Sequence, residues 1–568
     1  MNEVSGTPLS TLFVRPDANA RESLRVFSVK RTKLGGACMF KVLVSDPISD
    51  LGISLLVEAS DISIDKKTGL SEDELVSIIG EYDALLVRSQ TRVTERIMTA
   101  GKQLKVIGRA GVGVDNIDLE AATKRGIVVI NAPDGNTITT CEHTFAMMMA
   151  LARHIPQAYQ KTVGGEWDRK SFVGVELRNK VLGVLGMGRI GSEVAARAKA
   201  FGMSILGYDP FLTEERAEKL GVKLASVEDV IRGADFITVH TPLTPETRHM
   251  IGKEQFSRMK QGMRIINCAR GGIIDEVALV EAIDAGIVAG AAFDVFEEEP
   301  PKPDHPFLNH PKIVVTPHLG ASTVEAQENV AIDVSEQLLH ILRGEPYKNA
   351  VNMPSVPADI LSKIQPYFPI GRKLGSFAAQ MADGAVKEIV VSYSGELADV
   401  DTQPITRHVV EGVLAHHLGS DQVNPVSAMH LAKTRGLNIV TNKSHASKGF
   451  VNLVSVTLRT AKEERTVAAA LLNGFGARIT QIDQYPVDVA PEGHILLISH
   501  SDKPGIIGRV GTLLGSNDIN IATMQVGRKL AGGSAIMALG VDKAVPKEVL
   551  AQVAALPDLV SAKEIRLA

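Results

Sequence analysis

The sequence has few cysteines, few aromatic residues and no long apolar run, and each scarcity excludes a class of protein. Its three cysteines among 568 residues are an odd number, far apart, and lack the spacing of a disulfide framework or a metal-ligand cluster. No apolar run approaches the ~18 residues of a membrane-spanning helix. We therefore expect a reducing compartment, no structural metal and no membrane partner.

The sequence also lacks a large excess of charge of either sign, since the formal net charge is only -4. This near balance gives no electrostatic case for binding nucleic acid. The hydrophobic share of 45% and the charged share of 22% are ordinary for globular proteins, so these values leave enzymes and binding proteins open. The length predicts several domains, because a single core stops growing well below this size.

Residues 1–38 show neither strand alternation nor helical periodicity. Three interpretations stay open: a disordered N-terminal extension before a start at Met39, an organelle transit peptide, or an ordered extension. The acidic residues Glu3, Asp17 and Glu22 count against a transit peptide, because such peptides are poor in acids. We expect a cytoplasmic protein, and an organelle stroma if the segment is a transit peptide.

From residue 40 onward, short β-branched runs alternate with amphipathic segments, which indicates βαβ units and parallel sheets. A first series of expected strands precedes an apolar stretch, 141–159, that predicts one long crossing helix; a second series follows it. The expected strands of the first series are 41–46, 84–89, 105–111 and 127–133, and those of the second begin at 180, 204, 235, 264, 288 and 313.

The stretch "VLGVLGMGRIG" places Gly186, Gly188 and Gly191 between an expected strand and an expected helix. This spacing alone also fits a tight turn, but the strand and helix around it favour a dinucleotide site. The pyrophosphate would lie at the helix N-terminus. Asp209 follows eighteen residues after Gly191, at the end of the next strand, where a carboxylate binds the ribose hydroxyls of NAD and disfavours NADP.

Three successive strand ends carry chemically useful side chains: Arg270, the acidic run Glu297 to Glu299, and His318. Each alone is commonly a surface residue. Together, beside a dinucleotide site, they suit the oxidation of a secondary alcohol, where histidine takes the hydroxyl proton and a carboxylate orients its ring. An arginine can hold a 2-hydroxy acid with two parallel hydrogen bonds.

The motifs "GRAGVGVDNIDLEAAT", "GVLGMGRIG", "GYDP", "INCARGGIIDE", "AAFDVFEEEP" and "TPHLGAST" resemble the D-isomer-specific 2-hydroxyacid dehydrogenase family. From residue 40 to the C-terminus the chain is similar to the long-form branch that oxidises 3-phospho-D-glycerate to 3-phosphohydroxypyruvate, the first step of L-serine biosynthesis. The resemblance implies NAD as cofactor, His318 as acid/base, Glu299 as its partner and Arg270 as the residue that orients the substrate.

The resemblance also implies further contacts to cofactor and substrate. Gly111 and Gly113 would cradle the substrate carboxylate, while Arg88 and Arg109 would face the phosphate unless they are ordinary surface arginines. Cys268 would lie near the nicotinamide, though a small side chain filling a strand end explains it equally. The expected cofactor contacts are Gly186, Gly188, Arg189, Ile190, Gly191, Asp209, Thr241, Cys268 and Asp294.

The expected fold is α/β, with two Rossmann-like doubly wound domains, a mixed α/β intervening domain and a βαββαβ ACT domain. A discontinuous substrate domain would surround the inserted NAD domain, and a linker at 351–359 would lead to the last two. The expected bounds are 1–38 for the extension, 39–138 with 322–350 for the substrate domain, 139–321 for the NAD domain, 360–490 for the intervening domain and 495–568 for the ACT domain.

Two further expectations concern partners. In related ACT domains, the positions of His500, Asp502 and Asn520 meet an amino acid, which implies L-serine as an effector. The alternatives are that Asp502 caps a helix, that Asn520 is a turn residue and that the domain serves assembly alone. We expect a homo-oligomer, a dimer or a tetramer, joined around the helix at 141–159 and the segment 164–172 with Trp167, unless the helix packs only on its own domain.

Two other functions compete with this assignment. The same two-domain fold also serves NADH-sensing corepressors, which keep the catalytic residues but carry disordered tails. D-lactate dehydrogenases and glyoxylate or hydroxypyruvate reductases share the chemistry but lack the C-terminal domains. The ACT-like tail "GHILLISHSDKPGIIGRVGTLLG" therefore favours the biosynthetic enzyme.

Overall fold

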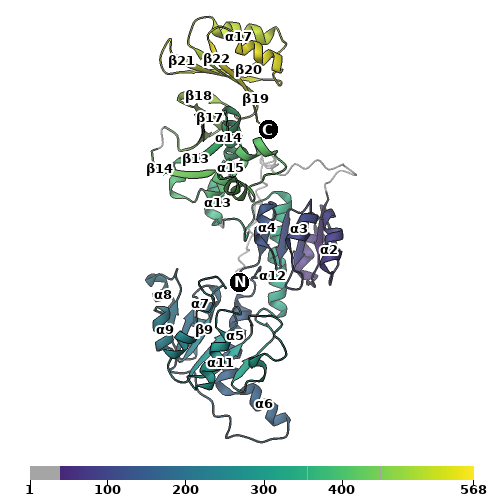
Figure 1. Ribbon diagram of the computed structural model, residues 1–568, viewed down its shortest axis with the longest axis vertical. Coiled ribbons are helices and arrows are strands. Elements are labelled where there is room, and N and C mark those ends of the chain that lie inside the picture. Colours follow the sequence, from purple (N-terminus) through teal and green to yellow (C-terminus); the bar gives the residue numbers. More distant parts are fainter. Residues whose placement is uncertain (1–38, 355, 447–448, 568) are drawn as a thin grey trace, which may run out of the picture.

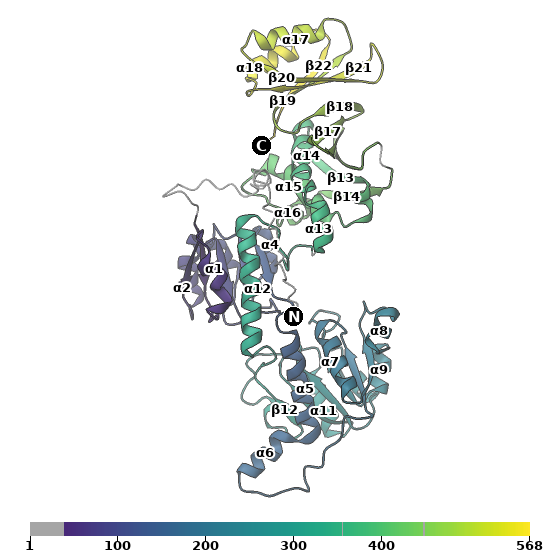
Figure 2. The same cartoon turned by 180° about the vertical axis from the view of Figure 1, so that it is seen from behind.

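Four β-sheets form four domains, which lie along the long axis of the molecule in the computed structural model in the order second, first, third and fourth (Figures 1 and 2). The structure describes residues 39–354, 356–446 and 449–567, so the predictions for residues 1–38 lie outside the described part. No helix within these ranges is long and apolar enough to cross a membrane. The predicted α/β class is confirmed, with two parallel sheets followed by a mixed and an antiparallel sheet.

The first sheet is parallel, in the order β2-β1-β3-β4-β5, because β-branched residues buried on both faces favour this arrangement. Its strands are β1 (Phe40–Val44), β2 (Ile62–Lys66), β3 (Ala84–Val87), β4 (Val106–Arg109) and β5 (Val128–Asn131). Its helices are α1 (Ser54–Glu58), α2 (Glu72–Ile78), α3 (Glu95–Ala100) and α4 (Leu119–Lys124). Ser71 and Glu74 form a capping box that starts α2. The distant helix α12 (Val324–Arg343) completes this core with Val330, Val334 and Leu338 (Figure 2).

The crossing segment is not the single helix that we expected at 141–159. Helix α5 (Thr137–Arg153) ends where His154 adopts a left-handed conformation, with φ of 54°, and a second helix, α6 (Ile155–Val163), follows. Pro156 stands in the first turn of α6, where its missing N–H is tolerated. The two helices also differ in burial, because α5 buries Phe145, Met148 and Leu151 in its own domain whereas α6 buries no residue.

The second sheet is parallel, in the order β12-β11-β10-β9-β6-β7-β8. Strand order reverses between β6 and β9, which is where open α/β sheets bind ligands. The strands are β6 (Val181–Leu185), β7 (Ser204–Tyr208), β8 (Lys223–Leu224), β9 (Phe236–Val239), β10 (Met263–Asn267), β11 (Val288–Phe293) and β12 (Ile313–Val315). The helices are α7 (Arg189–Ala200), α8 (Glu214–Leu220), α9 (Val227–Gly233), α10 (Lys253–Ser257) and α11 (Glu276–Asp284).

The third sheet has the order β14-β13-β15-β16-β17-β18, with one parallel pair, β13 and β14. Its strands are β13 (Val386–Gly395), β14 (Asn438–Ser444), β15 (Asn452–Thr460), β16 (Glu464–Leu472), β17 (Gly476–Ile482) and β18 (Tyr485–Val489). Its helices are α13 (Ala358–Ile364), α14 (Tyr367–Met381), α15 (Gln403–Leu418) and α16 (Ala428–Thr434).

The last domain has the predicted βαββαβ order and an antiparallel sheet, β20-β21-β19-β22. Its elements are β19 (Gly493–Ser501), α17 (Ile506–Gly515), β20 (Ile521–Arg528), β21 (Ser534–Val541), α18 (Lys547–Ala554) and β22 (Leu559–Leu567). Helices cover one face of the sheet. The other face joins the hydrophobic core of the preceding domain, and the backbone of Arg566 exchanges two hydrogen bonds with Gln380 of α14.

A short segment before α16 connects the third domain to the first. The side chain of Asn424 donates a hydrogen bond to the carbonyl of Gly126, at 2.7 Å, and Val426 is buried in the core of the first domain. The expected linker is also tied down, because Asn352 accepts a hydrogen bond from the backbone of Val129 at 2.9 Å. The C-terminal half is therefore fixed to the first domain through β5 and the turn before it.

Candidate active site

The carboxyl ends of β10, β11 and β12 carry Arg270, Glu299 and His318, as the sequence pattern predicted. Nδ1 of His318 lies 2.7 Å from Oε2 of Glu299, and the backbone N–H of Phe296 donates to the other oxygen of Glu299. Burial raises the pKa of Glu299, but the hydrogen bond from His318 and the charges of His318 and Arg270 outweigh it and leave that pKa below its usual value. The pair therefore joins an ionised carboxylate to an imidazole.

The three consecutive glutamates of the acidic run have three different partners. Glu297 lies 2.7 Å from the ring of His249, Glu298 pairs with Lys302 at 3.4 Å, and Glu299 alone contacts His318. The three glutamates are identical in composition, but only Glu299 directly precedes Pro300, and this position singled it out in the sequence.

The loop that carries His318 has a backbone conformation that is uncommon for a residue with a side chain. His318 has φ of 54°, and its N–H donates to the carbonyls of Asp294 and Thr316. The carboxylate of Asp294 is fully buried and accepts the backbone N–H groups of Leu319 and Gly320, at 2.7 and 2.8 Å. Asp294 thus holds the histidine loop, while its expected contact with the cofactor stays a prediction.

Arg270 extends from the second domain toward the first, where its Nε lies 3.2 Å from a carboxylate oxygen of Asp115. A β-carbon at Gly113 would overlap the Arg270 guanidinium, so the backbone of the "GRAGVG" loop passes directly beneath this side chain. Asp115 lies inside the "GVGVDNID" motif but was not among the residues predicted for the site.

Arg109 and Arg88 lie at the ends of β4 and β3, on the substrate-domain side of the same region. Burial, together with the charges of Arg270 and Arg88, lowers the pKa of Arg109 to about 10. Nε of Arg109 donates to the side chain of Asn116, which in turn donates to the carbonyl of Arg88. Asn116, which was not among the predicted site residues, therefore holds both Arg109 and Arg88 in place. The like charges of Arg88, Arg109 and Arg270 favour an anion between them.

The glycine loop lies at the reversal point of the second sheet, between β6 and α7. A β-carbon at Gly191 would overlap the carbonyl oxygen of Gly186, whereas the space around Gly188 is open. No side chain in the described part of the chain caps α7, whose N-cap is Gly188. The hydroxyl of Thr241, at the end of β9, is buried and finds no hydrogen-bond partner among the described residues. An open helix N-terminus and an orphaned hydroxyl fit a dinucleotide phosphate.

Other residues expected at this site have protein partners in the structure. The carboxylate of Asp209 accepts the backbone N–H groups of Met187 and Phe211, at 3.0 and 2.8 Å, and so closes the glycine loop. Arg189 forms an ion pair with Asp134 of the substrate domain. Burial raises the pKa of the Cys268 thiol, which supports a packing role for this residue.

The candidate effector residues lie around the end of β19. Asp502 accepts hydrogen bonds from Arg528, at 2.7 Å, and from the backbone of Gly532, and α17 begins at Gly505 without a side-chain cap. Asn520 instead donates to Asp542 at 2.7 Å. His500 is buried, and its Nε2 lacks a hydrogen-bond partner within the described ranges.

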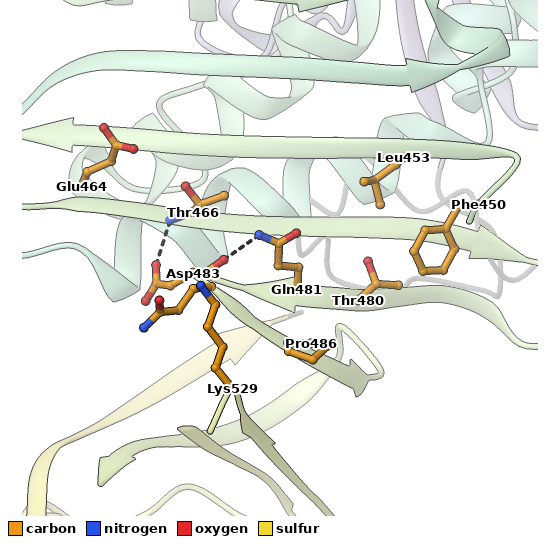
Figure 3. Close-up of a pocket in the computed structure, with 10 residues that line it drawn as sticks. Phe450, Leu453, Glu464, Thr466, Thr480, Gln481, Asp483, Pro486 and Lys529 are labelled. Carbon is orange, nitrogen blue, oxygen red and sulfur yellow. Dashed lines mark hydrogen bonds between the residues drawn. The ribbon is translucent and has the colours of Figure 1, made fainter. Parts of the chain in front are cut away.

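A hollow of about 660 Å³ lies where β16, β17 and the start of β18 face Lys529, which directly follows β20 (Figure 3). It is lined by Phe450, Leu453, Glu464, Thr466, Thr480, Gln481, Asp483, Gln484, Pro486 and Lys529. None of the residues expected to bind substrate, cofactor or effector lines it. Within the described ranges, no three His, Cys, Asp or Glu side chains come together as metal ligands.

Comparison with known proteins gives three family models along the chain. They are the D-isomer specific 2-hydroxyacid dehydrogenase NAD binding domain at residues 145–320, the D-3-phosphoglycerate dehydrogenase intervening domain at 363–483 and the ACT domain at 494–558. The three matches agree with the second, third and fourth sheets of the structure.

Full-length relatives extend this similarity to the first sheet. The D-3-phosphoglycerate dehydrogenase of Bacillus subtilis is 49% identical over 93% of this chain and all of its own length. The chloroplastic D-3-phosphoglycerate dehydrogenase 2 of Arabidopsis thaliana is 41% identical over 90% of this chain and 84% of its own. Among solved structures, a glyoxylate reductase from Paecilomyes thermophila is 30% identical, with a TM-score of 0.51 over 55% of this chain and 98% of its own. The chain therefore belongs to the D-isomer specific 2-hydroxyacid dehydrogenase family, and within it to the D-3-phosphoglycerate dehydrogenases that carry an intervening and an ACT domain.

Proposed function

We propose that this chain oxidises 3-phospho-D-glycerate to 3-phosphohydroxypyruvate with NAD, the first step of L-serine biosynthesis. The observation that carries the proposal is the Glu299–His318 pair, which lies close enough to Arg270 for its charge to lower the pKa of Glu299, at successive strand ends of the sheet that carries the glycine loop. The full-length relatives named D-3-phosphoglycerate dehydrogenase support this substrate over lactate or glyoxylate.

In this proposal, His318 removes the proton from the C2 hydroxyl of the substrate. Its Nδ1 faces Glu299, so Nε2 serves the substrate, and the carboxylate stabilises the imidazolium that forms. Bound NAD supplies the acceptor for the hydride that leaves C2. Gly186, Gly188, Arg189, Ile190, Gly191, Asp209, Thr241, Cys268 and Asp294 would line its site.

The substrate carries a carboxylate and a phosphate, and the arginines near His318 can bind both. Arg270 would bind the carboxylate and the C2 oxygen, with the backbone of Gly111 and Gly113 as a cradle. Arg88 and Arg109 would bind the phosphate, in agreement with the low pKa of Arg109, which reflects its burial and the nearby charges of Arg270 and Arg88.

The test is the turnover of His318→Ala and His318→Gln on a panel of 2-hydroxy acids, with 3-phospho-D-glycerate among them. We expect turnover to fall ~10²- to 10⁴-fold while NADH affinity, measured by fluorescence, stays within about twofold. His310→Gln is the matched control, because His310 lies in the same domain and pairs with Asp284, which is not a candidate site residue. A His318 variant that keeps most of its turnover, or a wild-type preference for another acid, would overturn the proposal.

We further propose a homo-oligomer, a dimer or a tetramer, joined through α6 and the segment after it. Tyr159, Val163, Trp167 and Val173 have between 66% and 83% of their surface exposed, whereas α5 is packed inside its own domain. Such a row of exposed apolar side chains on an extended arm is typical of a subunit contact.

We also propose that L-serine binds between ACT domains at His500, Asp502 and Asn520 and lowers activity. The buried and unpartnered Nε2 of His500 supports a ligand there, since such atoms are rare without a role. The ammonium of serine would compete with Arg528 for the carboxylate of Asp502.

A further inference from the structure

The histidine loop after β12 is held from one side by a helix that no catalytic role has involved so far. Helix α5 crosses between the first two domains, and three of its side chains contact this loop. The hydroxyl of Thr140 donates to the carbonyl of Gly320 at 2.9 Å, and that of Thr139 lies 3.2 Å from the hydroxyl of Thr323. His143, one helical turn beyond Thr139 on the same face, reaches the carboxylate that anchors the loop.

The contact of His143 is made inside the protein. Its Nε2 lies 3.1 Å from Oδ1 of Asp294 and 3.2 Å from the hydroxyl of Thr316, which itself donates to the same oxygen. The Asp294 side chain is 0% exposed, and that of His143 is 17% exposed. Burial raises the pKa of Asp294, but hydrogen bonds from His143, Thr316 and Leu319 outweigh it, so the pKa lies below its usual value. An ionised carboxylate can remain buried only with such donors.

The loop needs this support because His318 holds a left-handed backbone conformation, with φ of 54°, that a residue with a side chain rarely adopts. Such a conformation persists when the surrounding contacts over-determine it. Here the carboxylate of Asp294 accepts hydrogen bonds from the N–H groups of Leu319 and Gly320, and the hydroxyl of Thr140 donates to the carbonyl of Gly320. Both anchors depend on α5, directly or through His143.

We propose that His143 and Thr140 are positioning residues for His318, which act by fixing the 316–320 loop through Asp294 and the carbonyl of Gly320. Neither side chain belongs to the candidate cofactor or substrate contacts. The inference rests on the proposed role of His318, because it concerns the placement of that ring relative to the substrate.

The variants His143→Leu and Thr140→Val test the two anchors separately. Each removes the polar group and roughly keeps the volume, and we expect turnover to fall roughly 10- to 100-fold, since a displacement of about 1 Å costs this much in catalysis. The Michaelis constant for 3-phospho-D-glycerate and the NADH dissociation constant should stay within about twofold, because neither side chain is a proposed binding group and Asp294 keeps its donors Thr316, Leu319 and Gly320. His143→Gln keeps an N–H donor and should restore turnover to within a few-fold of wild type.

Glu142→Gln is the matched control, because Glu142 neighbours His143 on α5 but is exposed, and it should leave turnover unchanged. If His143→Leu does not fold, as judged by its melting curve, Thr140→Val and His143→Gln decide. Folded Thr140→Val and His143→Leu with wild-type turnover would overturn the inference, and so would an equal loss of NADH affinity, which would make these residues part of the cofactor site. Failure of the proposed function would look different, since activity would then survive His318→Ala.

Discussion

Nε of Arg270 lies 3.2 Å from Oδ2 of Asp115, so an arginine of the NAD domain is paired with a carboxylate of the substrate domain. A second pair, Arg189 with Asp134, joins the same two domains. Both arginines are candidates for binding an anion, and both are neutralised by the protein itself. The binding of substrate and cofactor would therefore replace these two internal ion pairs.

Removal of the carboxylate at Asp115 should strengthen substrate binding. Asp115→Asn leaves the Arg270 guanidinium without a competing anion, and we expect the Michaelis constant for 3-phospho-D-glycerate to fall roughly two- to fivefold, the scale of an exposed ion pair. Steady-state kinetics at low and high salt would measure this, and the effect should shrink as salt rises. Asp134→Asn is the comparison variant, since it should alter the constant for NAD instead. A higher Michaelis constant for 3-phospho-D-glycerate in Asp115→Asn would contradict the proposal that substrate displaces Asp115 from Arg270.

The carboxylate of Glu299 should matter far more than those of its two neighbours. Glu299→Gln removes the charge that stabilises the His318 imidazolium, and we expect turnover to fall up to ~10²-fold with little change in NADH binding. Glu298→Gln, which loses only a surface contact with Lys302, should behave like wild type. Equal turnover of the two variants in a steady-state assay would count against the pair.

Asp209 should govern the choice between NAD and NADP. Asp209→Ala removes a carboxylate that would repel a 2'-phosphate, so the ratio of kcat/KM for NAD to that for NADP should fall at least about tenfold. The same variant also loses a hydrogen bond to Met187 of the glycine loop and one to Phe211 in the turn after β7, so kcat/KM for NAD should fall as well. Wild-type enzyme that uses both cofactors equally would refute this assignment.

A charge at Trp167 should weaken the subunit contact. Trp167 is 83% exposed in a single chain, and burying an unpaired carboxylate between subunits is unfavourable, so Trp167→Glu should shift the mass toward monomer. Light scattering at micromolar concentration would show this. Phe211→Glu changes an equally exposed aromatic residue outside the arm and should keep the oligomer. A monomeric wild type would end the proposal.

Asp502→Ala should abolish the binding of L-serine to the full chain. The variant removes the carboxylate proposed to take the ammonium, and it also frees Arg528. Calorimetry should give measurable heat with wild type and none with the variant. Asp518→Ala, a change in the loop before β20 at a residue that is not a candidate effector contact, is the control. Unchanged serine affinity in Asp502→Ala would exclude this site.

The sequence predicted the strands near the site well, because buried β-branched runs followed by polar residues mark the ends of parallel strands. The positions of Arg270, Glu299 and His318 followed from this pattern. Strand β2 was missed, since "ISIDK" alternates polar residues at the edge of its sheet. The break at His154 was missed as well, because a left-handed histidine has no composition signal of its own.

Residues that support the site were much harder to predict. Asn116 and His143 are ordinary polar residues in sequence, and their importance depends on partners 28 and 151 positions away. Such contacts arise only when distant segments fold together. Sequence patterns therefore indicated the groups that would meet the substrate, whereas the groups that hold them in place emerged from the tertiary structure.

The shared core of the last two domains has a consequence for how the C-terminal half unfolds. Apolar residues of β19, β21 and β22 pack in one cluster with those of α14 and α15, and Gln380 and Lys563 bond across the boundary. The last domain has a core of its own between its sheet and its helices, but the core of the third domain is closed by the other face of that sheet, so the two should melt as one cooperative unit. A chain shortened at residue 490 would expose apolar residues of α14 to water and should aggregate. Its activity would therefore not measure the effect of removing the ACT domain alone.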